Sequence, residues 1–322
     1  MVLSSAIPTD AARRQFVIGT GFIGSSMHAL GTVLAKHMQQ NLRMRVTARP
    51  YVGPSAFIPL INSDELEMGL SSMGEARVAY LGIDTDPKKN IRTVARIMAM
   101  PFAFIVREDS DIKNIADLRG KKVVLDFAAA QAMTDMSTSM LRAAGLSRDD
   151  VEVITVSGVG PGVEAVVEGN ADAAPASVTM SATRKADATV GIRVLDLASE
   201  NFEEKLGDLV MAGIRPYIAP ARTLPGAETD MQIFALDMFI VVPAELEEED
   251  VNKILDGLHN SWTDIQNDYA GLAAFDPSGF VHSSQTVPYH PAAIKYYKSG
   301  KGSAIWDDDA EKRNQQLLDI WN

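Results

Sequence analysis

The segment FVIGTGFIGSSMHALGTVLAKHM, residues 16–38, contains the pattern that decides the fold. Phe16–Ile18 is a short apolar run typical of a buried strand, and a glycine-rich turn follows it. Apolar residues then recur at helical spacing along one face, at Met27, Leu30, Leu34 and Met38. A strand followed at once by an amphipathic helix is the building unit of a parallel sheet with helices on its faces.

The same unit recurs along the chain. Strands are expected at 45–48 and 67–71 and helices at 56–61 and 75–81; a second cycle places strands at 102–106, 122–125 and 151–156 and helices at 112–118, 133–144 and 163–168. The long apolar run Phe234–Val242 is able to carry the chain back to its first half. Two similar α/β cycles joined by long strands predict two domains with a cleft between them.

Composition excludes several classes of protein. A chain of 322 residues exceeds what one hydrophobic core usually serves. The net charge of −12, with acidic runs at Glu245–Asp250 and Asp307–Asp309, argues against nucleic-acid binding. No stretch approaches the roughly 20 apolar residues of a membrane span. Residues 1–15 show no signal peptide, so we expect a leader to have been removed if the protein is exported. Cysteine is absent, which excludes disulfides and a cysteine nucleophile.

The turn after the first strand offers an alternative. Gly19–Gly24 fits the G-x-G-x-x-G fingerprint of dinucleotide-binding folds, in which glycines admit a pyrophosphate close to the backbone. That fold needs an acidic residue about 20 residues further on, at the end of the next strand. Arg49 stands there instead, and no Tyr-x-x-x-Lys pair exists for hydride chemistry. We therefore expect no cofactor, and keep an NAD(P)-dependent oxidoreductase as the alternative.

Arg49 itself is a candidate ligand-binding residue. It ends a strand at the carboxyl edge of the expected sheet, which is where open α/β folds bind ligands. Its planar fork of donors suits a carboxylate, although an exposed arginine in a surface loop is an equally good interpretation. The five histidines are too scattered to form a metal signature, and no nucleophile elbow surrounds Ser25.

The chain resembles the TAXI family of solute-binding proteins from tripartite ATP-independent periplasmic (TRAP) transporters. The residues that carry the resemblance span about 16 to 300. They are the opening Ile18–Leu34, the segments Tyr51–Ile61 and Asn62–Gly82, the stretch Ile91–Asp126, and the sequence VPYHPAAIKYY at Val287–Tyr297.

The departures fall in the expected binding loops. Phe127–Met133 replaces a Gly-Ser-Gly-Thr-like loop, Phe22 and Ile23 replace small polar residues, Pro54 replaces a serine, and Met73-Gly74 replaces a Ser-Asp pair. Less polar loops favour a ligand with an apolar or aromatic portion.

The resemblance implies an α/β fold of the type II periplasmic binding proteins, with two crossover strands. One domain is expected at 1–102 plus 238–322 and the other at 103–237. It also implies a periplasmic, monomeric protein without enzyme activity. Such a protein captures a small organic acid by hinge closure and delivers it to TRAP membrane subunits. A ligand-sensing module of a regulator is a second alternative. The expected ligand-binding residues are Thr20, Phe22, Ser25, Arg49, Tyr51, Gly53, Ser72, Met73, Gln131, Met133, Thr134 and Ser177.

Overall fold

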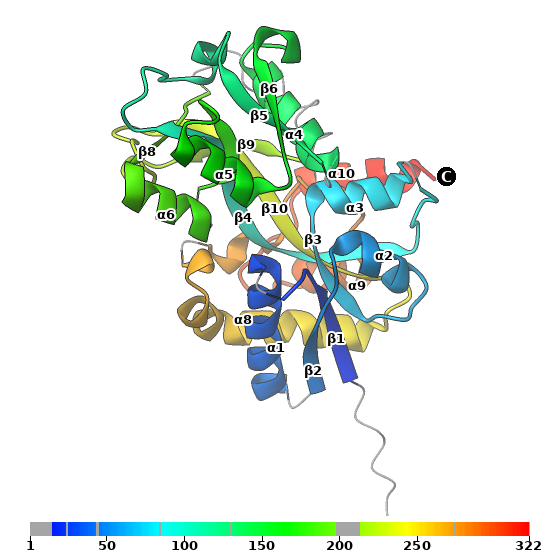
Figure 1. Ribbon diagram of the computed structural model, residues 1–322. Coiled ribbons are helices and arrows are strands. Elements are labelled where there is room, and N and C mark those ends of the chain that lie inside the picture. The colour runs from blue at the N-terminus through cyan, green and yellow to red at the C-terminus, as the bar shows by residue number, and fades with distance from the viewer. Residues whose placement is uncertain are drawn as a thin grey trace, which may run out of the picture.

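The computed structural model describes residues 15–23, 25–42, 45–83, 85–128, 131–178, 180–197, 213–273 and 275–321. The chain forms two α/β lobes, one above the other in Figure 1, and a pair of long strands runs between them.

Parallel strands form one side of the first lobe, which is the lower one in Figure 1. Strand β1 pairs in parallel with β2 on one side and with β3 on the other. Leu30, Leu34 and Met38 are fully buried, which confirms the apolar face predicted for the first helix. The elements, in chain order, are β1 (Gln15–Thr20), α1 (Ser26–Leu42), β2 (Arg45–Pro50), α2 (Pro54–Asn62), β3 (Met68–Ser72) and α3 (Met73–Leu81).

Two long antiparallel strands connect the lobes. They are β4 (Ile91–Arg107) and β10 (Met231–Pro243), and they pair over most of their length. Because β10 also pairs antiparallel with β3, the sheet is mixed, in the order β2-β1-β3-β10-β4-β7, where β7 is Ala174–Ser177. The strand predicted at 102–106 is only the end of β4, which continues back through Pro101 to Ile91.

The second lobe holds a smaller parallel pair, β5 and β6, together with strands that extend the main sheet. The helix predicted at 112–118 is only a 3-10 turn, Ile115–Leu118, whose start is capped by Asn114 and Asp117. Pro175 lies within β7 opposite Phe104. The elements are β5 (Lys122–Phe127), α4 (Gln131–Ala143), β6 (Glu152–Val156), α5 (Val159–Glu168), β7 (Ala174–Ser177), α6 (Ser181–Val190), β8 (Ile192–Val194) and β9 (Arg215–Ala219).

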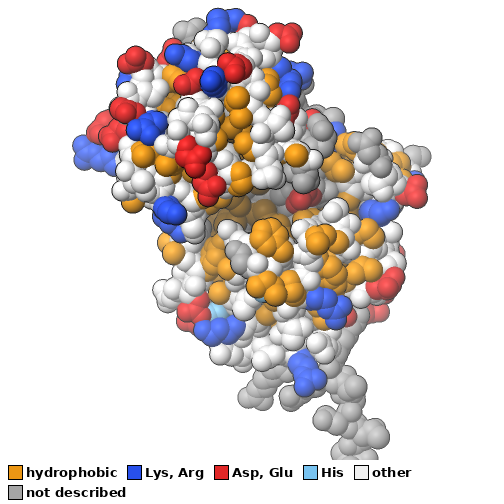
Figure 2. Space-filling view, in the orientation of Figure 1, with side chains coloured by type: hydrophobic (Ala, Val, Ile, Leu, Met, Phe, Trp, Pro, Cys, Tyr) orange, Lys and Arg blue, Asp and Glu red, His pale blue; other side chains and the backbone are white. Residues whose placement is uncertain are grey.

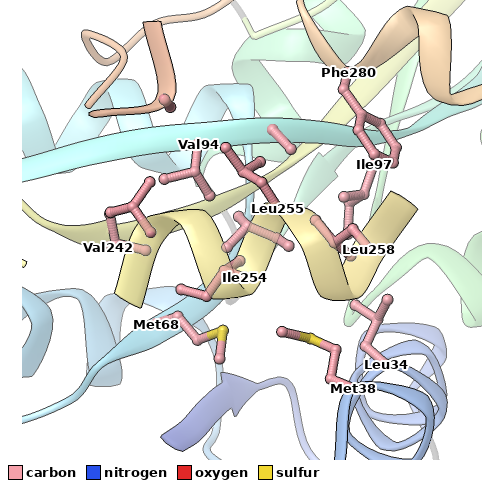
Figure 3. Packing of buried hydrophobic residues seen from close by; sticks show 14 of the residues in the cluster. Leu34, Met38, Met68, Val94, Ile97, Val242, Ile254, Leu255, Leu258 and Phe280 are labelled. Carbon is pink, nitrogen blue, oxygen red and sulfur yellow. The ribbon is translucent and has the colours of Figure 1, made fainter. Parts of the chain in front are cut away.

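The C-terminal helices return to the first lobe. They are α8 (Glu248–Asp268), α9 (Pro291–Lys298) and α10 (Asp308–Asp319). Figure 3 shows Ile254 and Leu258 of α8 within the cluster that also holds Leu34 and Met38 of α1. His290 caps the start of α9, because its Nδ1 accepts a hydrogen bond from the Ala292 amide at 3.1 Å. The segment at 287–297 is therefore part of the packing of the first lobe.

The glycine fingerprint has a packing role in this structure. A Cβ atom on Gly19 would lie 2.8 Å from the Phe57 ring, and one on Gly69 would lie 2.3 Å from the same ring. Both distances are shorter than carbon atoms tolerate, so the two glycines allow α2 to lie against β1 and β3. Close approach of an aromatic ring thus accounts for Gly19 without a bound dinucleotide. Gly24 lies outside the described residues.

A buried ionic network lies midway along the long strands. Asp237 of β10 is fully buried and accepts two hydrogen bonds from the Arg215 guanidinium, at 2.7 and 3.0 Å. Arg96 of β4 approaches the same carboxylate to 3.5 Å, and Ser284 donates its hydroxyl to it. Burial alone would raise the pKa of Asp237, but the charges of Arg215 and Arg96 outweigh burial and hold the pKa below its usual value. Because Arg215 belongs to β9 and Ser284 to the C-terminal segment, the network joins the two lobes at their connection.

Candidate ligand-binding site

A cavity of about 530 Å³ is bounded by residues of both lobes. Helices α1, α2 and α3 contribute side chains from the first lobe, α4 contributes from the second, and the two long strands contribute from between them. Figure 2 shows a hollow between the lobes with hydrophobic side chains around it. The volume falls within the range of about 300–1,000 Å³ that is usual for small-molecule sites.

The wall of the cavity is mainly apolar and rich in methionine. Long, unbranched thioether side chains adapt to ligands of different shape, which makes them common at adaptable binding surfaces. Met98 and Met238 lie opposite each other on β4 and β10, and Met100 and Leu236 form the next such pair. The six methionines of the wall are Met27, Met98, Met100, Met133, Met136 and Met238.

The polar groups of the wall are few. Ser26 and Ser55, near the starts of α1 and α2, contribute to it together with Lys88. The backbone N–H of Lys88 donates to the Ala79 carbonyl at 2.8 Å, which places the backbone of this residue beside the end of α3. An apolar wall with a small number of placed polar groups is the usual composition of a site for an organic solute.

Glu75 is the acidic group of the wall. The Ser72 hydroxyl accepts from the Glu75 amide at 3.2 Å and donates to Glu75 Oε2 at 3.1 Å, so the pair caps the start of α3. Burial raises the pKa of the Glu75 carboxyl, although the hydrogen bonds from Ser72 oppose that rise. Within the described residues, no ion pair to a cationic side chain offsets the burial of this carboxyl.

Two of the twelve predicted ligand-binding residues line the cavity: Ser72 of β3 and Met133 of α4. Met73, next to Ser72, is fully buried in the protein. The Oγ1 of Thr134 accepts from the Phe127 amide at 3.0 Å, which joins α4 to the end of β5. Gln131 begins α4, and Ser177 is buried on β7 opposite Phe102.

The predicted residues of the β1 and β2 edge lie together, but they do not line the cavity. Thr20 is buried; its Oγ1 donates to the Arg49 carbonyl at 3.1 Å and lies 2.9 Å from His28 Nδ1. The Arg49 side chain is exposed, and its Nη1 donates to the Tyr51 hydroxyl at 3.5 Å.

The remaining predicted residues surround this edge. Ser25 Oγ accepts from the His28 amide at 3.1 Å, and Gly53 precedes α2. The Tyr51 ring packs against Phe57. Phe22, with an exposed fraction of 62%, and Val52, with 83%, are large apolar side chains open to solvent.

Most residues of the cavity wall were not predicted from the sequence to bind ligand. Five of the six methionines, Glu75 and Lys88 were not predicted to bind ligand. Glu75 carried a local signal, because Ser72-x-x-Glu75 has the spacing of a capping box, but that signal indicates a helix start and not a ligand.

Among the described residues, no three His, Asp or Glu side chains come together as a set able to hold a metal ion. None of the helices described there is long and apolar enough to cross a membrane.

Solved structures with this architecture come from several bacteria. The periplasmic aliphatic sulphonate binding protein SsuA of Escherichia coli is 16% identical, with a TM-score of 0.53, over 95% of this chain and 91% of that one. A TctC solute binding protein from Polaromonas is 14% identical, with a TM-score of 0.54, over 97% of this chain and 100% of that one. MatC from Rhodopseudomonas palustris, solved with bound malate, is 13% identical, with a TM-score of 0.54, over 96% and 99% of the two chains.

These likenesses confirm the predicted fold class, which is that of the two-domain periplasmic binding proteins. A family model extends the comparison to sequence, because it matches residues 18–300, from the end of β1 to the end of α9. The chain belongs to the NMT1-like family.

Proposed function

We propose that this protein is an extracytoplasmic solute-binding protein that captures a small organic acid with an apolar portion and delivers it to a membrane transporter. The observation that carries the proposal is the cavity of about 530 Å³, which both lobes line and whose wall is mainly apolar. The match to the NMT1-like family and the fold shared with SsuA, TctC and MatC support it. The proposed function is the binding of a solute without its chemical conversion.

The transporter that we propose is of the TRAP type, and the protein would be its TAXI-like, monomeric, periplasmic binding component. The basis is the resemblance of residues 16 to 300, above all that of Val287–Tyr297, to the TAXI family. Delivery follows from closure, since a permease that distinguishes the closed from the open form accepts the loaded protein.

Closure is proposed to occur about β4 and β10. The moving bodies would be residues 1–102 plus 238–322 and residues 103–237. Met133 and Met136 belong to the second body, whereas Met27 and Glu75 belong to the first. A solute that contacts both sets of side chains stabilises the closed form by the difference between its affinities for the two forms.

A panel of solutes tests this function. We expect monocarboxylates, dicarboxylates, keto acids, aromatic acids or sulfonates to include compounds that raise the melting temperature. A ligand at 100 times its Kd stabilises the native state by about 2.7 kcal/mol, which corresponds to a shift of several degrees for a chain of this size. Differential scanning fluorimetry measures it. Stabilisation by NADH or NADPH alone would support the oxidoreductase alternative and refute the binding-protein function.

Lys88 is the proposed partner of the acid group, because it is the cation of the cavity wall. Arg49 is proposed as a further contact at the cleft edge, made when the lobes close. We expect Lys88→Gln to weaken binding of the best acid about tenfold or more, and Arg49→Ala to weaken it by about fivefold or less, because exposed ion pairs contribute under about 1 kcal/mol. Calorimetric titration of both variants measures this. The reverse order of losses would make Arg49 the principal partner.

A further inference from the structure

Glu75 lies in the wall of an apolar cavity, and no cationic side chain among the described residues forms an ion pair with its carboxyl. Its capping contacts with Ser72 occupy one carboxylate oxygen, Oε2. Helix capping does not require a place in the cavity wall, since the same box is made at exposed helix ends. The position of Glu75 among methionines therefore needs a second explanation.

Binding of a solute in the cavity is energetically unfavourable for the Glu75 carboxylate unless the solute replaces the water that it displaces with a favourable contact. An apolar solute that fills the cavity removes water from the Glu75 carboxylate, and removal of water from an unpaired charge is strongly unfavourable. A second carboxylate placed there would add repulsion between like charges. A protonated nitrogen would instead form an ion pair that also uses hydrogen bonds, the arrangement in which a buried carboxylate is most stable.

We propose that Glu75 binds a protonated nitrogen of the solute, such as an ammonium or amidinium group attached to its apolar body. The proposal rests on the solute-binding function given above and adds a chemical class to it. The acid group of the same solute would lie toward Lys88, which lines the same cavity and forms no ion pair with Glu75.

The charge of the whole protein favours the same class of solute. A net charge of −12 repels a simple anion at long range and attracts a cationic group. A solute that carries a nitrogen cation as well as an acid group avoids most of this repulsion. The net negative charge of the protein and the Glu75 carboxyl therefore both favour a solute that carries a cationic group.

The test compares two probes that differ in one group. Para-methylbenzoate and para-(aminomethyl)benzoate share their ring and carboxylate, and only the second carries a protonated nitrogen. Both are titrated calorimetrically into the wild-type protein and into the Glu75→Gln and Glu164→Gln variants. Gln at position 75 keeps the backbone N–H that donates to the Ser72 hydroxyl, so α3 retains its N-terminal cap. Glu164 is exposed on α5 of the other lobe and serves as the matched control for loss of one negative charge.

We expect wild type and Glu164→Gln to bind the aminomethyl compound about tenfold or more tightly than the methyl compound. In Glu75→Gln this preference should fall below about threefold. Equal or tighter binding of the methyl compound by wild type, or a preference that survives Glu75→Gln, would overturn the role of Glu75 and leave solute capture intact. Failure of both compounds to bind at millimolar concentration would contradict the proposed organic-acid function as well.

Discussion

Replacement of Asp237 by alanine should lower the free energy of unfolding by about 3–5 kcal/mol. The change leaves the guanidinium groups of Arg96 and Arg215 without the carboxylate that they share. Their side chains are only 10% and 14% exposed, so water does not replace the lost partner. The expected loss of stability is therefore the cost of leaving buried positive charge without a partner. Urea denaturation followed by circular dichroism measures it.

The control for this substitution is Asp109→Ala. Asp109 also pairs with an arginine, Arg107, at 3.2 Å, but 71% of the Asp109 side chain is exposed. An exposed pair of this kind contributes under about 1 kcal/mol. If the Asp237→Ala variant lost no more stability than this control, the network would not hold the lobes as described.

Replacement of Met100 by tryptophan should abolish binding of the best solute from the panel, with an affinity loss of about a thousandfold or more, or roughly 4 kcal/mol. Met100 is partly buried and lies on β4 in the cavity wall, opposite Leu236. An indole ring at this position would occupy space that the solute requires. The fold should survive, because the ring extends into an existing cavity and not into packed core. Calorimetric titration measures the binding, and thermal unfolding checks the fold.

Ile218→Trp is the matched control. Ile218 lies on β9, is 52% exposed and does not line the cavity. The same ring placed there should leave the Kd within about threefold of the wild-type value. Undiminished binding by Met100→Trp would mean that the solute binds elsewhere.

The fold was largely predictable because its signals are local. The pattern of Leu30, Leu34 and Met38 marks the buried face of α1 within a few turns of sequence. Prediction failed where tertiary pairing overrides a local signal. Pro101 lacks an N–H for the ladder, yet β4 continues through it opposite Ala235.

The candidate site was predictable only at its sheet-edge positions. Ser72 follows from the rule that ligands bind at the carboxyl ends of parallel strands. Met98 and Met238 have the same apolar character as core residues, and only their pairing across β4 and β10 brings them to one wall. For Arg49, the sequence predicts the position of the backbone but not that of the side chain. The rule places its backbone at the sheet edge, but it does not determine where a long side chain points.

Small-angle X-ray scattering tests closure around a solute most directly. The protein is measured alone and at saturation with the compound that stabilises it most in the panel. Closure of the two lobes about β4 and β10 predicts a smaller radius of gyration at unchanged molecular mass. A scattering curve that stays the same at saturation would contradict the proposal that this protein captures its solute by closing the two lobes.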